Sequence, residues 1–290
     1  MRALYVRAGR IAKEAREFGV EHAKAGKSAL ELADSIEALI RSRGASPAFP
    51  VNIGINQIAA HYTPSRADDV VLQLGDVVKI DVGAHVDGYP ADTSATVEVG
   101  TRNHSPLIKC ASDALEMVIE MVSPGTTVAA MGEAAQRAIA SAGFKPIENL
   151  TGHSMERYNL HAGMSIPSIP TRDRDTVKEG MVLAIEPFST TGSGKVVGRE
   201  RGNIYRIVRE RKASPEVSSM FSRIVKEYGT FPFASRWCDG LQPDAPQVMN
   251  RMTRLGMIMN YPVLTEVRSA IVAQAEHSVL VDGDGCTVLT

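Results

Sequence analysis

The chain has 290 residues, of which 44% are hydrophobic and 22% are charged, and its formal net charge at pH 7 is −1. These values are ordinary for a globular protein, and so small a net charge gives no overall field that would attract nucleic acid or a membrane. The three cysteines, Cys110, Cys238 and Cys286, lie too far apart for a CxxC motif, and no signal peptide or membrane-spanning run is present, so we expect a cytoplasmic protein without a membrane partner.

The first part of the chain predicts two helices followed by strands. The first helix covers residues 3–22 and the second covers about 28–43. Ser28 and Glu31 have the spacing of a capping box, and Gly44 is a typical stop signal. The stretch "SPAFP" then favours extended structure, which continues to about residue 99.

The same pattern restarts in the middle of the chain. Ser105-Pro106 is a helix start with proline at the first position, and the predicted helix runs to about Met121. A further helix covers about 128–142 and ends at Gly143. Extended segments follow again.

The last part predicts a helical block inserted before the closing strands. We expect helices at about 215–228 and 245–259, and strands over 270–281 and in "CTVLT". The whole block, about 211–262, has a small core of its own, so we treat it as an insertion and not as a domain.

An internal repeat connects the two halves. "GDVVKID" ends at Asp81, and "GMVLAIE" ends at Glu186, so an acid occupies the same strand position in both copies. His61 precedes the first acid and His161 precedes the second at similar distances. These matching places make both histidines candidate catalytic residues.

A hairpin is predicted around the Asp-Gly pair at 87–88, which is the strongest local signal for a two-residue type I′ turn. This turn pairs Gly83 with Asp92 and Asp81 with Ser94, which places both acids on one face of the sheet. Gly83 would then leave space between the acids. A β-bulge would change this register.

Two like charges on one buried face are unfavourable unless a proton, an arginine or a metal ion joins them. The rest of the sequence favours metal, because Glu186 follows from the repeat, Glu276 is a lone acid in an apolar strand pattern, and His153 follows a glycine. The charges of four carboxylates match two divalent cations. Oxygen-rich ligation with one nitrogen suits Mn, Co, Fe or Zn, and two such ions are typical of a two-metal hydrolase.

The segment from Lys195 to Lys212 is basic, with seven Lys or Arg residues against Glu200 and Glu210. Such a run is usually a solvated surface. The alternative is contact with an RNA surface such as the ribosome.

Six motifs give a family resemblance over nearly the whole chain: "AFPVNIGINQIAAHYTP", "KIDVGAHVDGYPADTS", "LTGHSMERYNLHAG", "LAIEPFSTTGSGKV", "KEYGTFPFASRW" and "QAEHSVLV". In this order they resemble the type 2 methionyl aminopeptidases, in the short form that archaea carry. The resemblance implies an α+β pita-bread fold, in which two pseudo-twofold halves form a single catalytic domain over 1–290. It also implies that the block at about 211–262 is the type 2 insertion.

The resemblance also implies the roles of individual residues. The implied metal ligands are Asp81, Asp92, His153, Glu186 and Glu276. It implies that His61 and His161 contact the substrate. The implied methionine pocket lies near Phe49, Leu160, Phe188 and Tyr261.

The function that follows is removal of the N-terminal methionine from nascent polypeptides with a small, uncharged second residue. Hydroxide activated by two metal ions would attack the first peptide bond, with Glu186 as the general base and then acid. The family suggests a monomer. The alternatives are an Xaa-Pro peptidase of the prolidase or aminopeptidase P kind, and a non-catalytic binding protein on the same fold.

Overall fold

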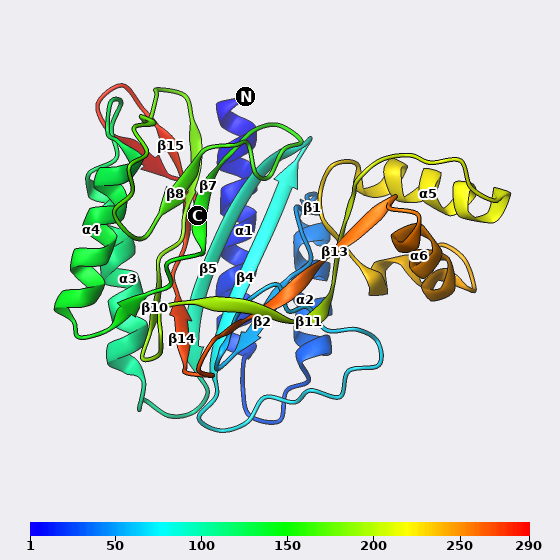
Figure 1. Cartoon of the computed structure of the whole chain (residues 1–290), viewed down its shortest axis with the longest axis horizontal. Coiled ribbons are helices and arrows are strands. Elements are labelled where there is room, and N and C mark those ends of the chain that lie inside the picture. The colour runs from blue at the N-terminus through cyan, green and yellow to red at the C-terminus, as the bar shows by residue number, and fades with distance from the viewer.

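The computed structural model describes residues 1–290 and shows two α+β halves with a lobe on one side (Figure 1). The elements of the first half are α1 (Arg2–His22), α2 (Ala29–Ser42), β1 (Ser46–Pro47), β2 (Asn52–Ile55), β3 (Ile58–Ala60), β4 (Val77–Val86) and β5 (Tyr89–Glu98). In its main sheet β4 lies between β1 and β2 on one side and β5 on the other. α1 packs on β4 and β5, and the core of this half has 20 buried residues.

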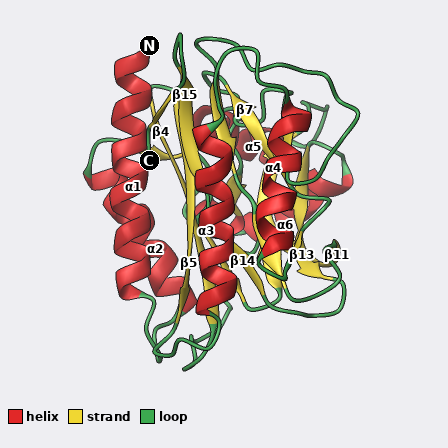
Figure 2. Cartoon of the chain, turned by 90° about the vertical axis from the view of Figure 1, so that its left-hand side faces the viewer, coloured by secondary structure: helices red, strands yellow, loops and turns green.

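The second half repeats this order of elements around a five-stranded sheet, β16-β15-β9-β7-β8. Its elements are α3 (Ser105–Glu120), α4 (Val128–Ser141), β6 (Lys145–Pro146), β7 (Thr151–Met155), β8 (Ser165–Pro167), β9 (Val182–Ile185), β10 (Phe188–Thr190), β14 (Val272–Gln274), β15 (His277–Val281) and β16 (Cys286–Val288). α1, α3 and α4 stand together on one side of the strands (Figure 2). No helix is both long and apolar enough to span a membrane.

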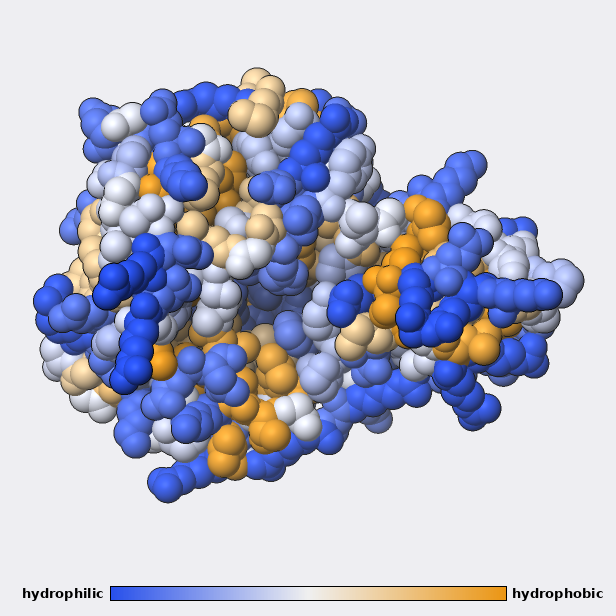
Figure 3. All heavy atoms as spheres, turned by 45° about the horizontal axis from the view of Figure 1, so that its top comes forward, coloured by the Kyte–Doolittle hydropathy of each residue, from blue (hydrophilic) through white to orange (hydrophobic).

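The lobe extends from a ribbon of two long antiparallel strands with a short strand on each edge, which the sequence did not predict. Its elements are β11 (Val196–Ile207), α5 (Pro215–Tyr228), β12 (Phe233–Ala234), the 3₁₀ helix η1 (Ser235–Cys238), α6 (Ala245–Arg254) and β13 (Ile258–Glu266). β11 and β13 pair along most of their length, and α5 and α6 lie at the far end, where a separate core of 13 buried residues forms. Figure 3 shows this lobe standing apart from the hollowed main body.

The predicted helix over 245–259 is wrong in its last five residues. α6 ends at Arg254, and the chain turns at Gly256, whose φ of 65° suits glycine. Ile258 then pairs with Ile207 and begins β13. Pairing with β11 therefore wins over the helical pattern of the last predicted turn.

Each half contains the same backbone hydrogen bond at the start of its second helix, a correspondence that the sequence repeat predicted only in outline. Gly26 N–H donates to Leu72 O at 2.8 Å, and Gly125 N–H donates to Val177 O at 2.9 Å. The N-terminus of α2 is capped by the Ser28 hydroxyl, and that of α4 by a threonine hydroxyl at position 127. The same turn-and-cap arrangement thus begins the second helix of each half.

Candidate metal centre

The β4–β5 hairpin has the predicted register. The turn residues at 87 and 88 have φ values of 51° and 80°, as a type I′ turn requires. Asp81 pairs with Ser94 and Gly83 pairs with Asp92, with no bulge between them. Both aspartates therefore project from the same face of the hairpin.

Gly83 has a different role from the one predicted. A Cβ at this position would lie 2.2 Å from Cε1 of Phe49, so the aromatic ring fills the space over the glycine. The predicted gap between the two acids is thus taken by a wall of the cavity. The glycine is required by the close approach of Phe49.

The other three candidate ligands come from the second half. His153 lies in β7, Glu186 follows the end of β9, and Glu276 lies between β14 and β15. Glu276 forms an isolated β-bridge with Ser94, which joins the edges of the two halves beside the hairpin. The candidate site is therefore built where the halves meet.

The candidate ligands lie around one cavity of about 270 Å³. Asp92, His153 and Glu276 each offer a ligand atom, and these atoms lie within 4.8 Å of one another. The distance from His153 Nε2 to Asp92 Oδ2 is 3.5 Å. Asp81 and Glu186 line the same cavity.

The charges at the site have no basic partner in the protein. Oδ1 of Asp81 and Oδ1 of Asp92 have no hydrogen-bond partner, and none of the four carboxylates pairs with a lysine or an arginine. Burial raises the pKa of Asp92 to about 8, and burial together with Asp92 raises the pKa of Asp81. Burial and the neighbouring acids also raise the pKa values of Glu186 and Glu276. The arginine alternative is thus excluded, and the donor set fits divalent cations.

Three histidines at the cavity are neutral. Burial lowers the pKa values of His61, His153 and His161 to about 4. The rings of His153 and His161 lie 4.3 Å apart between centroids, and His61 meets Tyr261 edge-on at 5.2 Å. A neutral imidazole can ligate a metal or donate one N–H to a substrate.

The predicted methionine pocket lies on the same cavity, because Phe49, Leu160, Phe188 and Tyr261 all line it. Ile204 from the ribbon also lines the cavity, and no sequence pattern indicated it.

Two polar residues of the site were also missed. Asn52 lines the cavity; its Nδ2 donates to Pro50 O at 3.0 Å, and its Oδ1 has no hydrogen-bond partner. Gln274 Nε2 donates to Glu186 at 3.2 Å and to Glu276 at 3.4 Å. The spacing of Gln274 two residues before Glu276 was a usable signal, since alternate residues of an extended chain share a face.

Comparison with known proteins shows the family. The sequence matches metallopeptidase family M24 over residues 3–226. The methionine aminopeptidase of Pyrococcus horikoshii is 44% identical over 98% of both chains. The chain belongs to the methionine aminopeptidases of family M24.

Other relatives and structures agree with this M24 assignment. The methionine aminopeptidase of Archaeoglobus fulgidus is 42% identical over 100% of this chain and 98% of its own. The structure of a Thermotoga maritima methionine aminopeptidase has a TM-score of 0.71 at 22% identity, covering 98% of this chain and 94% of that chain. A thermophilic Arx1 has a TM-score of 0.87 at 19% identity, covering 99% and 89%, which shows the shared fold alone. The predicted pita-bread fold is confirmed, and membership in a metallopeptidase family implies a divalent metal cofactor.

Proposed function

We propose that this chain removes the N-terminal methionine from nascent polypeptides whose second residue is small and uncharged. The observation that carries the proposal is a single cavity that brings together four carboxylates, three neutral histidines and an apolar wall. Such a cavity suits a short chain end better than an internal peptide segment. The relatives named as methionine aminopeptidases support the choice of methionine.

We assign five residues as ligands of two divalent ions, for which Mn, Co, Fe and Zn are the candidates. These residues are Asp81, Asp92, His153, Glu186 and Glu276. Two such ions would lower the pKa of a water molecule and polarise the peptide carbonyl. The unpartnered carboxylate oxygens and the neutral His153 supply the donor atoms that this requires.

The remaining polar groups hold the substrate. His161 lies beside His153, and we propose that its N–H stabilises the oxyanion that develops at the scissile carbonyl. His61, which lies beside Tyr261, would hold the substrate amide. Asn52 Oδ1 would accept a hydrogen bond from the free α-amine. Glu186 would take a proton from the attacking water and return it to the leaving amine.

The apolar wall provides the selectivity. Phe49, Leu160, Phe188 and Tyr261 offer a surface that fits the flexible, polarisable thioether of methionine. The small cavity leaves little room for a bulky second residue. We therefore expect alanine, glycine and serine to be accepted at that position.

The deciding experiment compares turnover of Met-Ala-Ser with turnover of an Xaa-Pro dipeptide after chelation and restoration of each metal in turn. Preferential cleavage of Met-Ala-Ser is the expected result. Preferential cleavage of the Xaa-Pro bond would favour a prolidase, whose Pyrococcus furiosus example shares the fold at a TM-score of 0.65. Binding of less than one divalent ion per chain at saturation would favour a non-catalytic binding protein.

We further propose a cytoplasmic monomer that meets its substrates at the ribosome. The basic segment from Lys195 to Lys212 runs along β11 and the loop after it. Light scattering tests the monomer. Cosedimentation with ribosomes at low and high salt tests the contact, which should weaken with salt because it is electrostatic.

A further inference from the structure

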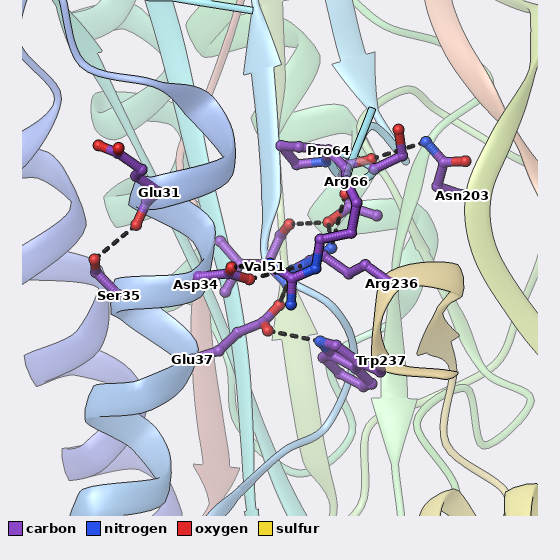
Figure 4. A network of polar contacts seen from close by, with 12 residues as sticks. Glu31, Asp34, Ser35, Glu37, Val51, Pro64, Arg66, Asn203, Arg236 and Trp237 are labelled. Carbon is purple, nitrogen blue, oxygen red and sulfur yellow. Dashed lines mark hydrogen bonds and ion pairs between the residues drawn. The ribbon is translucent and has the colours of Figure 1, made fainter. Parts of the chain in front are cut away.

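A buried polar network joins the lobe to the first half of the molecule. Figure 4 shows Arg236 reaching from the lobe toward Asp34 and Glu37 of α2 and toward the segment that follows His61. Arg236 belongs to η1, so it lies far in sequence from all of its partners. We call Asp34, Glu37, Thr63, Arg236 and Trp237 the Arg236 network.

The guanidinium of Arg236 is completely enclosed and donates four hydrogen bonds. Its side chain is 0% exposed, and that of Glu37 is 1% exposed. Nε donates to Asp34 at 3.2 Å, Nη1 donates to Thr63 Oγ1 at 2.6 Å and to Pro64 O at 3.1 Å, and Nη2 donates to Glu37. The planar fork of an arginine allows one side chain to bind two chain segments at once, α2 and residues 63–64.

The same network holds the backbone of Val51 from both sides. Val51 N–H donates to Glu37 Oε1 at 3.2 Å, and Val51 O accepts from the Thr63 hydroxyl at 2.8 Å. Trp237 Nε1 donates to the other oxygen of Glu37 at 2.6 Å. Val51 directly precedes Asn52, which lines the cavity.

Thr63 and Pro64 stand just after His61, which has an unusual backbone. The φ of His61 is 64°, a left-handed conformation that a residue other than glycine keeps only when its surroundings fix it. The neighbouring Tyr62 O accepts from Ile53 N–H at 2.9 Å, so the two edges of the cavity are also joined directly. Beyond this bond, side-chain contacts to both edges come from the Arg236 network, and Asn203 Nδ2 donates to Thr63 O at 3.3 Å.

The contribution of the Arg236–Glu37 ion pair to net stability does not explain why the pair is buried. A buried ion pair contributes little compared with apolar residues of the same size, because desolvation offsets the attraction. A geometric role fits the contacts better. We propose that Arg236, with Glu37, is a positioning residue: through Thr63 and Val51 it sets the place of His61 and Asn52 at the active cavity, and so makes the lobe part of the catalytic apparatus.

The inference rests on the proposed function for its kinetic test, and a second test does not need that function. The variant is E37Q/R236M, which removes both charges together and so leaves no unpaired buried charge. R236M alone is the companion variant, and it leaves Glu37 with only Arg41, at 3.8 Å, as a charge partner. The matched control is E216Q/R251Q, an ion pair at 2.7 Å in the same lobe whose side chains are 40% and 55% exposed.

The first readout is hydrogen exchange of the metal-free protein, followed by mass spectrometry. E37Q/R236M should speed exchange in peptides that contain Val51, Ile53 and Thr63, and should leave peptides of α3 and α4 unchanged. The control should leave all of these peptides unchanged. Unchanged exchange around Val51 and Thr63 in E37Q/R236M would overturn the inference, whether or not the protein cleaves Met-Ala-Ser.

The second readout is the kinetics of the metal-loaded enzyme. E37Q/R236M should lower kcat/KM for Met-Ala-Ser roughly 10- to 100-fold, because a displacement of about 1 Å can cost that much. In an H61A background the same change should cost less than about threefold, because groups that act through one another are not additive. If E37Q/R236M lowered kcat/KM by the same factor in the wild-type and H61A backgrounds, the effect would be a general structural one and would contradict the proposal. A wild-type protein inactive on Met-Ala-Ser would count against the proposed function alone, since the exchange test stands by itself.

Discussion

The contribution of Asp92 to the stability of the metal-free protein should fall as the pH rises from 5 to 8. Burial raises the pKa of Asp92 from 3.8 to about 8, so the folded state holds a proton that the unfolded chain has already lost. Stability falls with pH wherever the folded state binds more protons than the unfolded state. The buried histidines, whose pKa values are lowered from 6.5 to about 4, act in the opposite direction at the acid end of this range, so the contribution of Asp92 is read as the difference between the wild type and Asp92→Asn.

The magnitude follows from that single group. One pKa unit corresponds to about 1.4 kcal/mol, so each pH unit in this window lowers the free energy of unfolding by about that amount. Over three pH units the loss is about 4 kcal/mol, a large share of the roughly 5–15 kcal/mol that stabilises an ordinary domain. The raised pKa values of Asp81, Glu186 and Glu276 act in the same direction. Bound divalent metal should remove this slope, because it keeps the carboxylates deprotonated.

The assay is urea denaturation at pH 5, 6, 7 and 8, with the protein in chelator or in excess Mn. Between pH 5 and 8 the metal-free Asp92→Asn variant should gain about 4 kcal/mol of stability relative to the metal-free wild type, since it lacks the group that resists ionisation. Asp113→Asn is the matched control, because this aspartate lies on the exposed surface of α3. A stability difference between Asp92→Asn and the wild type that stays constant between pH 5 and 8 would refute the reasoning.

Three further predictions concern the walls and the helices. His161→Ala should lower kcat for Met-Ala-Ser roughly 10²- to 10³-fold, as expected for a lost oxyanion donor, and unchanged turnover would exclude that role. Gly83→Ala should destabilise the protein by about 1–3 kcal/mol in urea denaturation and raise KM, because its Cβ would collide with Phe49 in the cavity wall; a stability within error of wild type would contradict the contact. Ser28→Ala and Thr127→Ala should each cost about 1 kcal/mol of unfolding free energy, and clearly unequal losses would argue against equivalent caps in the two halves.

Much of the fold could be predicted because its signals are local. Helix starts at Ser28 and Ser105 depend on capping and on proline at the first turn, and both appear where expected. The hairpin register also follows from a local signal, the turn at 87–88. These features depend on a few neighbouring residues, so distant contacts did not change them.

The parts that escaped prediction depend on contacts between distant segments. The end of α6 is set by pairing of β13 with β11. The role of Gly83 is set by Phe49, and the network around Arg236 joins segments that no sequence period connects. Periodicity carries no information on such pairs, so the candidate ligands could be found while the residues that position them could not.

The two halves differ in the length of chain that connects their central paired strands, and this length determines where further elements can be accommodated. In the first half β4 and β5 are joined by a two-residue turn, which sets the register of the aspartates on both strands. In the second half β9 and β15 pair in the same way, yet the whole ribbon and its lobe lie between them in sequence. A change in the length of the lobe therefore leaves every proposed ligand on its own strand or at its edge, while the Arg236 network restricts changes where the lobe meets α2. Of the two similar halves, the first thus keeps its paired strands directly connected, and the second accommodates an insertion between them.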